Sequence, residues 1–120
     1  MAQVRWSLTA GNDLQDIEDF IARDSVLHAI TFVDRIVEST ETLLKTPQIG
    51  RIVPEFTRPD LREVIFRGYR IVYVVQDNEV VILRVVLRGK SELFSVDTLI
   101  TMLTHTGLKV DVRVRRSAAA

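Results

Sequence analysis

Three runs of branched and aromatic residues follow one another in the middle of the chain, at Leu61–Phe66, Tyr69–Val75 and Val80–Leu87. Such side chains suit a pleated sheet, so each run predicts a short strand. The breaks between the runs contain Gly68 and Asn78, and both residue types tolerate the positive φ of tight turns. The pattern therefore predicts an antiparallel meander around which the rest of the chain is organised.

The first 24 residues predict a strand followed by a helix. Apolar side chains alternate with polar ones at Val4, Trp6 and Leu8, as in a half-buried strand. Farther on, apolar residues recur at the helical spacings of three and four, at Leu14, Ile17 and Ile21. We expect Thr9 to be the N-cap of this helix and the helix to end near Asp24.

A second helix is predicted from Ser25, which caps it, to a point before Pro47, because proline restricts the residue that precedes it. Its apolar stripe consists of Ala29, Phe32, Ile36 and Leu43. The very short link between the helices predicts an antiparallel hairpin. Because short helices are marginal alone, the hairpin must pack its apolar faces on one side of the sheet.

The residues after Gly89 predict a further helix and strand. Ser95 is the expected cap of a helix that ends at Gly107, and residues 109–115 alternate valine with charged side chains. We expect residues 1–90 to form the main domain, residues 91–116 to pack on it as a helix–strand extension, and residues 117–120 to be a disordered tail. A further strand would also cover a sheet edge.

Composition narrows the function classes. A chain of 120 residues is one small domain. It contains no cysteine, which excludes a disulfide, a thiolate nucleophile and a cysteine zinc site. We expect no cofactor and no metal. Four acidic residues near the start of the first helix predict a solvated helix face, and these residues are Asp13, Asp16, Glu18 and Asp19. No signal peptide and no membrane-spanning apolar run is recognisable, which favours a cytoplasmic protein.

Charge is distributed unevenly although the net charge is zero. Residues 1–60 contain 6 basic and 10 acidic residues, a net charge of −4, whereas residues 61–120 contain 10 basic and 6 acidic residues, a net charge of +4. One interpretation is a basic face for a polyanion. The other is that acidic side chains solvate the helices while arginines lie on the strands.

Several arginines are candidate functional residues. Strand parity predicts one face with Val80, Ile82, Arg84, Val86 and Arg88, and the other with Val81, Leu83, Val85 and Leu87. Arg62 and Arg70 lie on the neighbouring strands. If these arginines converge, they form a cluster suited to phosphate or carboxylate. Alternatively, they form structural ion pairs with Glu63, Glu55 and the helix acids.

The loop from Pro47 to Asp60 offers two further candidates, because loops on rigid scaffolds carry many binding residues. These candidates are Arg51 and Glu55. The alternative is that they pair with each other and fix the loop to the sheet.

The stretch REVIFRGYRIVYVV, with the segment from Gly50 to Glu55 before it, resembles the signature of the RelE/ParE superfamily of toxins from bacterial type II toxin–antitoxin systems. The residues that carry the resemblance are Gly50, Arg51, Pro54, Glu55, Arg62, Glu63, Tyr69, Arg70, Ile71, Tyr73 and the Val-Ile-Leu-Arg run ending at Arg84. It covers about residues 3 to 90. The resemblance implies an α+β fold of β-α-α-β-β-β order, with a helical hairpin packed on an antiparallel sheet.

The resemblance also implies growth inhibition, a cognate antitoxin, and one of two targets. ParE-like members bind and poison DNA gyrase, whereas RelE-like members cleave mRNA on the ribosome. Cleavage requires an acid and a base, and the late His or Tyr of the nucleases has no counterpart in this sequence. We therefore favour the gyrase-directed function, without excluding an enzyme, and a homodimer is a further option.

Two sets of candidate residues follow from this comparison. The catalytic candidates for a nuclease are Arg51, Glu55, Arg62, Arg84 and Arg88. The candidates for target binding are Arg62, Arg70, Arg84, Arg88 and Lys90.

The segment FSVDTLITMLTHTGLKVDVRV, which begins at Phe94, is similar to the C-terminal end of HigA-like antitoxins. This similarity suggests a third function, a self-capped toxin that acts as an interaction module. Truncation near Lys90 would then restore growth inhibition.

Overall fold

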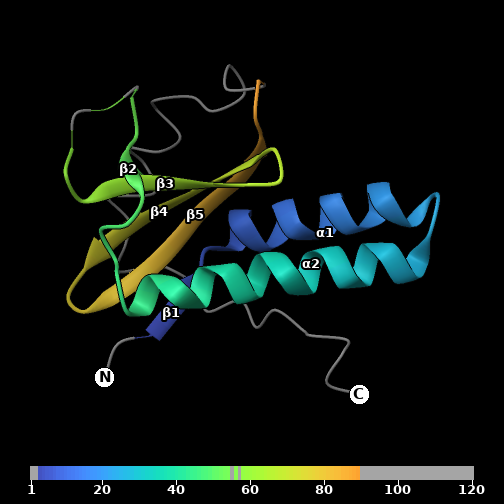
Figure 1. Cartoon of the computed structure of the whole chain (residues 1–120), viewed down its shortest axis with the longest axis horizontal. Coiled ribbons are helices and arrows are strands. Elements are labelled where there is room, and N and C mark those ends of the chain that lie inside the picture. Colours follow the sequence, from blue (N-terminus) through green and yellow to red (C-terminus); the bar gives the residue numbers. More distant parts are fainter. Residues whose placement is uncertain (1–2, 55, 57, 90–120) are drawn as a thin grey trace.

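The computed structural model describes residues 3–54, 56 and 58–89 of the chain. The elements in order are β1 (Gln3–Trp6), α1 (Leu8–Ala22), α2 (Val26–Glu41), the 3-10 helix η1 (Thr42–Leu44), β2 (Arg51–Ile52), β3 (Leu61–Phe66), β4 (Tyr69–Gln76) and β5 (Glu79–Leu87). In the described part the strands form a five-stranded sheet, in the order β1-β5-β4-β3-β2, with the α1–α2 hairpin against it (Figure 1). The predicted α+β fold is confirmed.

The central meander agrees with the prediction to within one residue at each strand end. Both tight turns have two consecutive residues of positive φ, at Arg67 (48°) and Gly68 (90°), and at Asp77 (49°) and Asn78 (62°). This geometry matches the twist of the flanking strands, which explains the abrupt chain reversals.

β1 pairs in parallel with the edge of β5, from Gln3 opposite Glu79 to Trp6 opposite Ile82, so the sheet is mixed. The prediction of a purely antiparallel sheet is wrong at this edge. The helical hairpin and the meander separate β1 from β5, so no tight turn forces the two strands to run in opposite directions.

The first helix begins two residues earlier than predicted, because its cap is Ser7 and not Thr9. Ser7 is the N-cap, because its Oγ accepts a hydrogen bond from Ala10 N at 3.0 Å. Leu8, expected on the buried side of a strand, is the first helical residue and is exposed. The prediction of Thr9 was wrong because Ser7 stands where β1 ends and can cap the helix at once. Ser25 caps α2 as predicted, with its Oγ accepting from His28 N at 3.1 Å.

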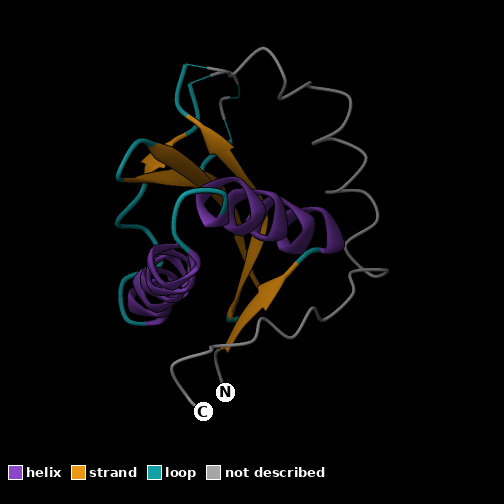
Figure 2. Ribbon diagram, turned by 90° about the vertical axis from the view of Figure 1, so that its right-hand side faces the viewer, coloured by secondary structure: helices purple, strands orange, loops and turns teal. Residues whose placement is uncertain are grey.

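Apolar residues are buried on both faces of the sheet. Between hairpin and sheet lies a core whose buried members are Trp6, Ala10, Leu14, Ile17, Val33, Ile36, Val37, Leu43, Ile71, Tyr73, Val80, Ile82 and Val85. A second cluster contains Val53, Leu61, Val72, Val74, Val81 and Leu83. Since Val72 and Val74 alternate with Ile71 and Tyr73 along β4, the two clusters lie on opposite faces. Figure 2 shows the two helices packed against the sheet.

A bulge changes the parity of β5. Val72 lies opposite Arg84, whereas the next residue, Tyr73, lies opposite Ile82, so Leu83 is the extra residue. An extra residue shifts all later side chains to the other face. Ile82 and Val85 therefore share the core under the helices, and the predicted faces are wrong beyond Leu83.

The predicted helix and strand of residues 91–116, the predicted disorder of residues 117–120, and residues Glu55 and Lys90 lie outside the described residues. Within the described part, no helix is long and apolar enough to cross a membrane.

Candidate functional site

A buried carboxylate links two of the candidate arginines. The side chain of Glu63 is fully buried, and its Oε1 lies 2.6 Å from Arg70 Nη2 while its Oε2 lies 2.6 Å from Arg51 Nη2. The Arg70 side chain is only 6% exposed, whereas that of Arg51 is 60% exposed. Glu63 compensates the buried charge of Arg70, so Arg70 has a structural partner and Arg51 presents its outer side to solvent.

Arg62 is bound to the main chain of the preceding loop. Its Nε donates to Pro59 O at 2.9 Å, and its Nη1 donates to Gly50 O at 2.9 Å and to Gln48 O at 3.4 Å. These bonds fix both ends of the segment between Gln48 and Pro59, which includes Arg51 in β2. Arg51 pairs with Glu63, and the predicted pair with Glu55 lies outside the described residues.

Tyr73 also holds the start of this segment, through its side-chain hydroxyl. Its hydroxyl donates to Pro47 O at 2.7 Å and accepts from Gly50 N at 3.0 Å. Gly50 is required here because an added Cβ would lie 2.6 Å from both Glu63 O and Tyr73 Oη. Burial raises the pKa of Tyr73 above its usual range, and burial likewise raises the pKa of Tyr69.

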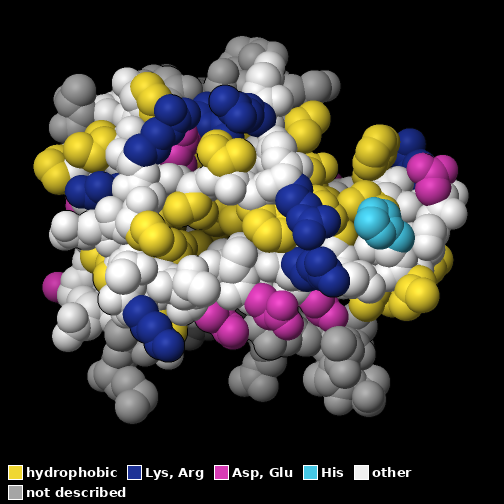
Figure 3. Space-filling model, viewed as in Figure 1, with side chains coloured by type: hydrophobic (Ala, Val, Ile, Leu, Met, Phe, Trp, Pro, Cys, Tyr) yellow, Lys and Arg dark blue, Asp and Glu magenta, His cyan; other side chains and the backbone are white. Residues whose placement is uncertain are grey.

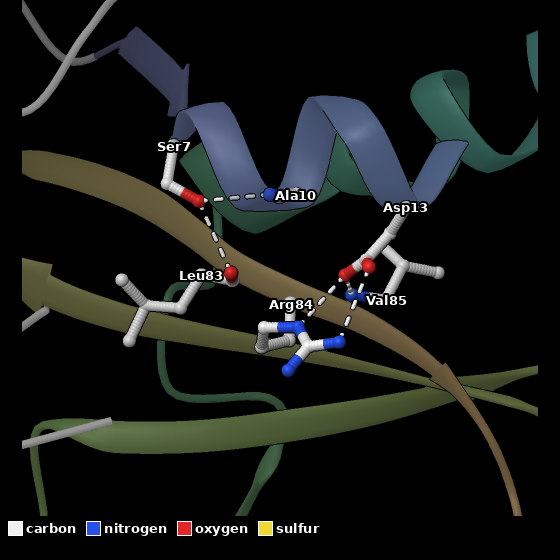
Figure 4. A network of polar contacts seen from close by, with 6 residues as sticks. All are labelled: Ser7, Ala10, Asp13, Leu83, Arg84 and Val85. Atoms are coloured by element: carbon white, nitrogen blue, oxygen red, sulfur yellow. Dashed lines mark hydrogen bonds and ion pairs between the residues drawn. The ribbon is translucent and has the colours of Figure 1, made fainter. Parts of the chain in front are cut away.

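Arg84 lies against the first helix (Figure 4). Its Nε and Nη2 donate to the Asp13 carboxylate at 2.9 and 3.2 Å, and Val85 N donates to Asp13 Oδ2 at 2.8 Å. Ser7 Oγ donates to Leu83 O at 3.1 Å just beyond the end of β1. The start of α1 therefore covers the edge of β5 that β1 leaves unpaired. Asp13, expected on a solvated face, has this structural role.

The candidate arginines do not share one face. Arg62 lies opposite Tyr73 in the register, on the side of the helices, whereas Arg70 alternates with it on the other side. Arg84 is directed to Asp13, and Arg88 is exposed at the end of β5. Arg70 and Arg84 thus have the ion pairs that the structural interpretation predicted, and Glu55 and Lys90 are outside the described residues.

Outside these pairs, Arg58 and Asp60 form an exposed ion pair just before β3. A hydrogen bond from Arg58 lowers the pKa of Asp60, and the same pair raises the pKa of Arg58. His28 is exposed on α2, with its ring 6.3 Å from that of Phe32. Among the described residues, no group of three or more His, Asp or Glu could hold a metal ion.

The structure also contains a groove that sequence reasoning missed. One hollow of about 510 Å³ is lined by Thr46, Pro47, Gln48, Ile49 and Val75. A second, of about 440 Å³, is lined by Arg35, Glu38, Ser39, Phe66 and Arg67. Figure 3 shows an apolar band between the sheet and α2 on this face of the molecule. We call the two hollows and this band the α2 groove.

The floor of the α2 groove is built from the flank of the core. Phe66 and Val75, which line the two hollows, pack on the buried cluster but remain partly accessible. The ring centres of Phe66 and Phe32 lie 6.0 Å apart with the ring planes tilted by 56°, and Ile49 at the other end is 65% exposed. Pockets of this size with apolar floors are typical binding sites. The sequence contains one sign of this groove, which is the presence of apolar residues at the end of a strand (Phe66) and in a loop (Ile49). The alternation of residues along a strand does not predict that these side chains are accessible.

Comparison with known proteins gives a consistent result. A family model described as "ParE toxin of type II toxin-antitoxin system, parDE" matches residues 4–91, nearly three quarters of the chain. A solved structure titled "Chromosomal ParDE TA system from P. aeruginosa" is similar with a TM-score of 0.63 and 24% identity, over 74% of this chain and 98% of that chain. At this identity the similarity shows the fold alone. Comparison with curated proteins gives no match.

Proposed function

The chain belongs to the ParE toxin family of type II toxin–antitoxin systems, and on this basis we propose that it arrests growth by binding DNA gyrase until a cognate antitoxin covers it. The observation that carries this proposal is a contrast between the polar candidate residues and the apolar groove in the described part. The polar candidates Arg62, Arg70 and Arg84 are held in structural contacts, whereas the α2 groove has an accessible apolar floor. An accessible apolar groove beside arginines that already have partners supports binding to another macromolecule.

Binding accounts for the site better than RNA cleavage does. Cleavage by a nuclease requires a base for the 2′-hydroxyl and an acid for the leaving oxygen. The Tyr73 hydroxyl donates to Pro47 O and accepts from Gly50 N, so its proton is already engaged, and its raised pKa disfavours it as a base. The Arg58–Asp60 pair keeps that carboxylate ionised at neutral pH, which disfavours it as an acid. These features support the gyrase-directed function over the ribosome-dependent nuclease.

The α2 groove is the proposed antitoxin site. One wall follows α2 from Arg35 to Glu41 and then η1 to Leu44, a span of roughly 15 Å at rises of about 1.5 Å and 2.0 Å per residue. An amphipathic helix or extended segment of about three turns fits this length, with its apolar side on Phe66 and Val75. Covering these side chains removes exposed apolar surface, which stabilises the complex.

Induced expression without an antitoxin tests the target. DNA synthesis and protein synthesis are followed separately in the first minutes after induction, with an uninduced culture as control. The proposal predicts early loss of DNA synthesis with gyrase-linked breaks. Early loss of translation with cleaved transcripts would instead establish the nuclease function.

A self-capped toxin is the second candidate, and the extent of the family match favours it. The match ends at residue 91, so residues 92–120 lie outside the region shared with the family. Expression of the full chain would then be harmless, and a chain truncated after Gly89 would inhibit growth. Equal toxicity, or equal inertness, of the two forms contradicts self-capping.

A further inference from the structure

We propose that Arg35 and Arg67 form a clamp for one carboxylate at the Phe66 end of the α2 groove, and that an Asp or Glu side chain of the antitoxin occupies it. The inference rests on the proposed function and adds the chemistry of the partner. The antitoxin segment would carry apolar residues along the groove and one acidic residue at this end.

Two separate elements bring these two arginines to the same hollow. Arg35 projects from α2, Arg67 stands in the turn between β3 and β4, and both line the hollow together with Phe66. The Arg67 guanidinium carbon lies 5.5 Å from the centre of the Phe66 ring. This cation–π contact and the tight turn restrict the Arg67 side chain before any partner arrives, which lowers the entropy cost of binding.

These two arginines differ in their partners from half of the ten arginines of the described part. Carboxylates pair with the guanidinium groups of five others, which are Arg5, Arg51, Arg58, Arg70 and Arg84. Arg35 and Arg67 make no ion pair with any residue that the structure describes, although both are exposed. A bidentate carboxylate is the group that an arginine fork binds best.

The net charge of the hollow lined by Arg35 and Arg67 favours binding of a single carboxylate over binding of a nucleic-acid backbone. Glu38 lines the same hollow as the two arginines, so the site has an excess of one positive charge, which a single carboxylate neutralises. Nucleic-acid binding depends on a continuous basic track along the phosphates. Here the hollow continues into an apolar band, and Figure 3 shows acidic side chains along the lower margin of this face.

Charge reversal tests the clamp. The probe is the purified cognate antitoxin, and its Kd for the chain is measured by calorimetry at low and high salt. The variants are Arg35→Glu, Arg67→Glu and the double variant. Arg23→Glu is the matched control, because Arg23 also lies 5.5 Å from a phenylalanine ring, that of Phe20, but does not line the groove. Circular dichroism verifies folding of each variant.

The clamp predicts that the double variant binds the antitoxin about 100-fold more weakly, since hydrogen bonds to charged groups are lost at both arginines. The loss should shrink at high salt, and growth inhibition should persist. Replacement of one acidic antitoxin residue by arginine should restore binding to the double variant.

Equal affinity of the double variant and the Arg23→Glu control overturns the clamp and leaves the proposed function intact. Loss of growth inhibition with unchanged antitoxin affinity also overturns it, because the arginines would then face the target. A wild-type chain that does not bind the antitoxin would contradict the proposed function itself.

Discussion

Replacement of Glu63 by glutamine is predicted to destabilise the protein severely, although Glu63 belongs to neither apolar cluster. The glutamine side chain has nearly the same size as that of glutamate but carries no charge. The buried Arg70 guanidinium would lose the carboxylate at 2.6 Å, and Arg51 would lose its partner on the same group. The substitution therefore isolates the electrostatic role of one side chain.

The size of this loss of stability follows from the burial of the Glu63 and Arg70 side chains. The Glu63 side chain is fully buried and that of Arg70 is 6% exposed, and removal of one member of a buried ion pair costs about 3–5 kcal/mol. Because glutamine can still make a hydrogen bond, we expect the low end, about 3 kcal/mol. In a domain of this size that corresponds to a fall in Tm of roughly 12 °C.

Urea denaturation of the wild type and the variant measures this difference directly. Asp60→Asn is the control, because it makes the same chemical change in the Arg58–Asp60 pair, whose side chains are 49% and 38% exposed. Exposed pairs contribute less than about 1 kcal/mol. The reasoning is refuted if Glu63→Gln costs no more than Asp60→Asn, since burial would then not decide the strength of the pair.

Three other substitutions or titrations test the remaining contacts. Gly50→Ala should cost about 1–3 kcal/mol in urea denaturation, because the new Cβ would meet Glu63 O and Tyr73 Oη at 2.6 Å; stability equal to wild type would show that the loop can move away. Asp13→Asn should speed hydrogen exchange at the Val85 amide, which loses an ionised acceptor at 2.8 Å, whereas Asp16→Asn, an exposed position, should leave that amide unchanged. Because burial raises the pKa of Tyr73 above 10 in the folded state, its contribution to stability is present below pH 10 and is lost as the pH rises through the folded value. Absorbance titration should therefore place tyrosine ionisation above pH 10, and Tyr73→Phe should remove part of this pH dependence; a normal midpoint for Tyr73 would contradict its burial.

Local patterns were sufficient for most of the fold. The strands of the meander have bounds close to those predicted because branched residues and the Gly68 and Asn78 turns act within a few residues of one another. Ser25 was found as a cap for the same reason. Residues in this region also carry the resemblance to the toxin superfamily, and the family match confirms that resemblance.

Contacts between distant segments were not predictable from local pattern. The bulge at Leu83 changed the faces of β5, and nothing in the alternation of valines and leucines marks it. Ser7 became the cap because β1 ends beside β5, and Asp13 met Arg84 across 71 positions of sequence. The α2 groove arises from the fit between a helix and a sheet, so single residues such as Arg35 carried no signal.

Gyrase binding is the proposed mode of action of this chain. The most direct test incubates the purified chain with purified gyrase, ATP and closed circular DNA, and then measures linear DNA after denaturation of the protein. The proposed function predicts linear DNA that increases with toxin concentration and disappears when the antitoxin is added first. Unbroken DNA at every toxin concentration, together with cleaved mRNA in a translation reaction that contains the same protein, would contradict it.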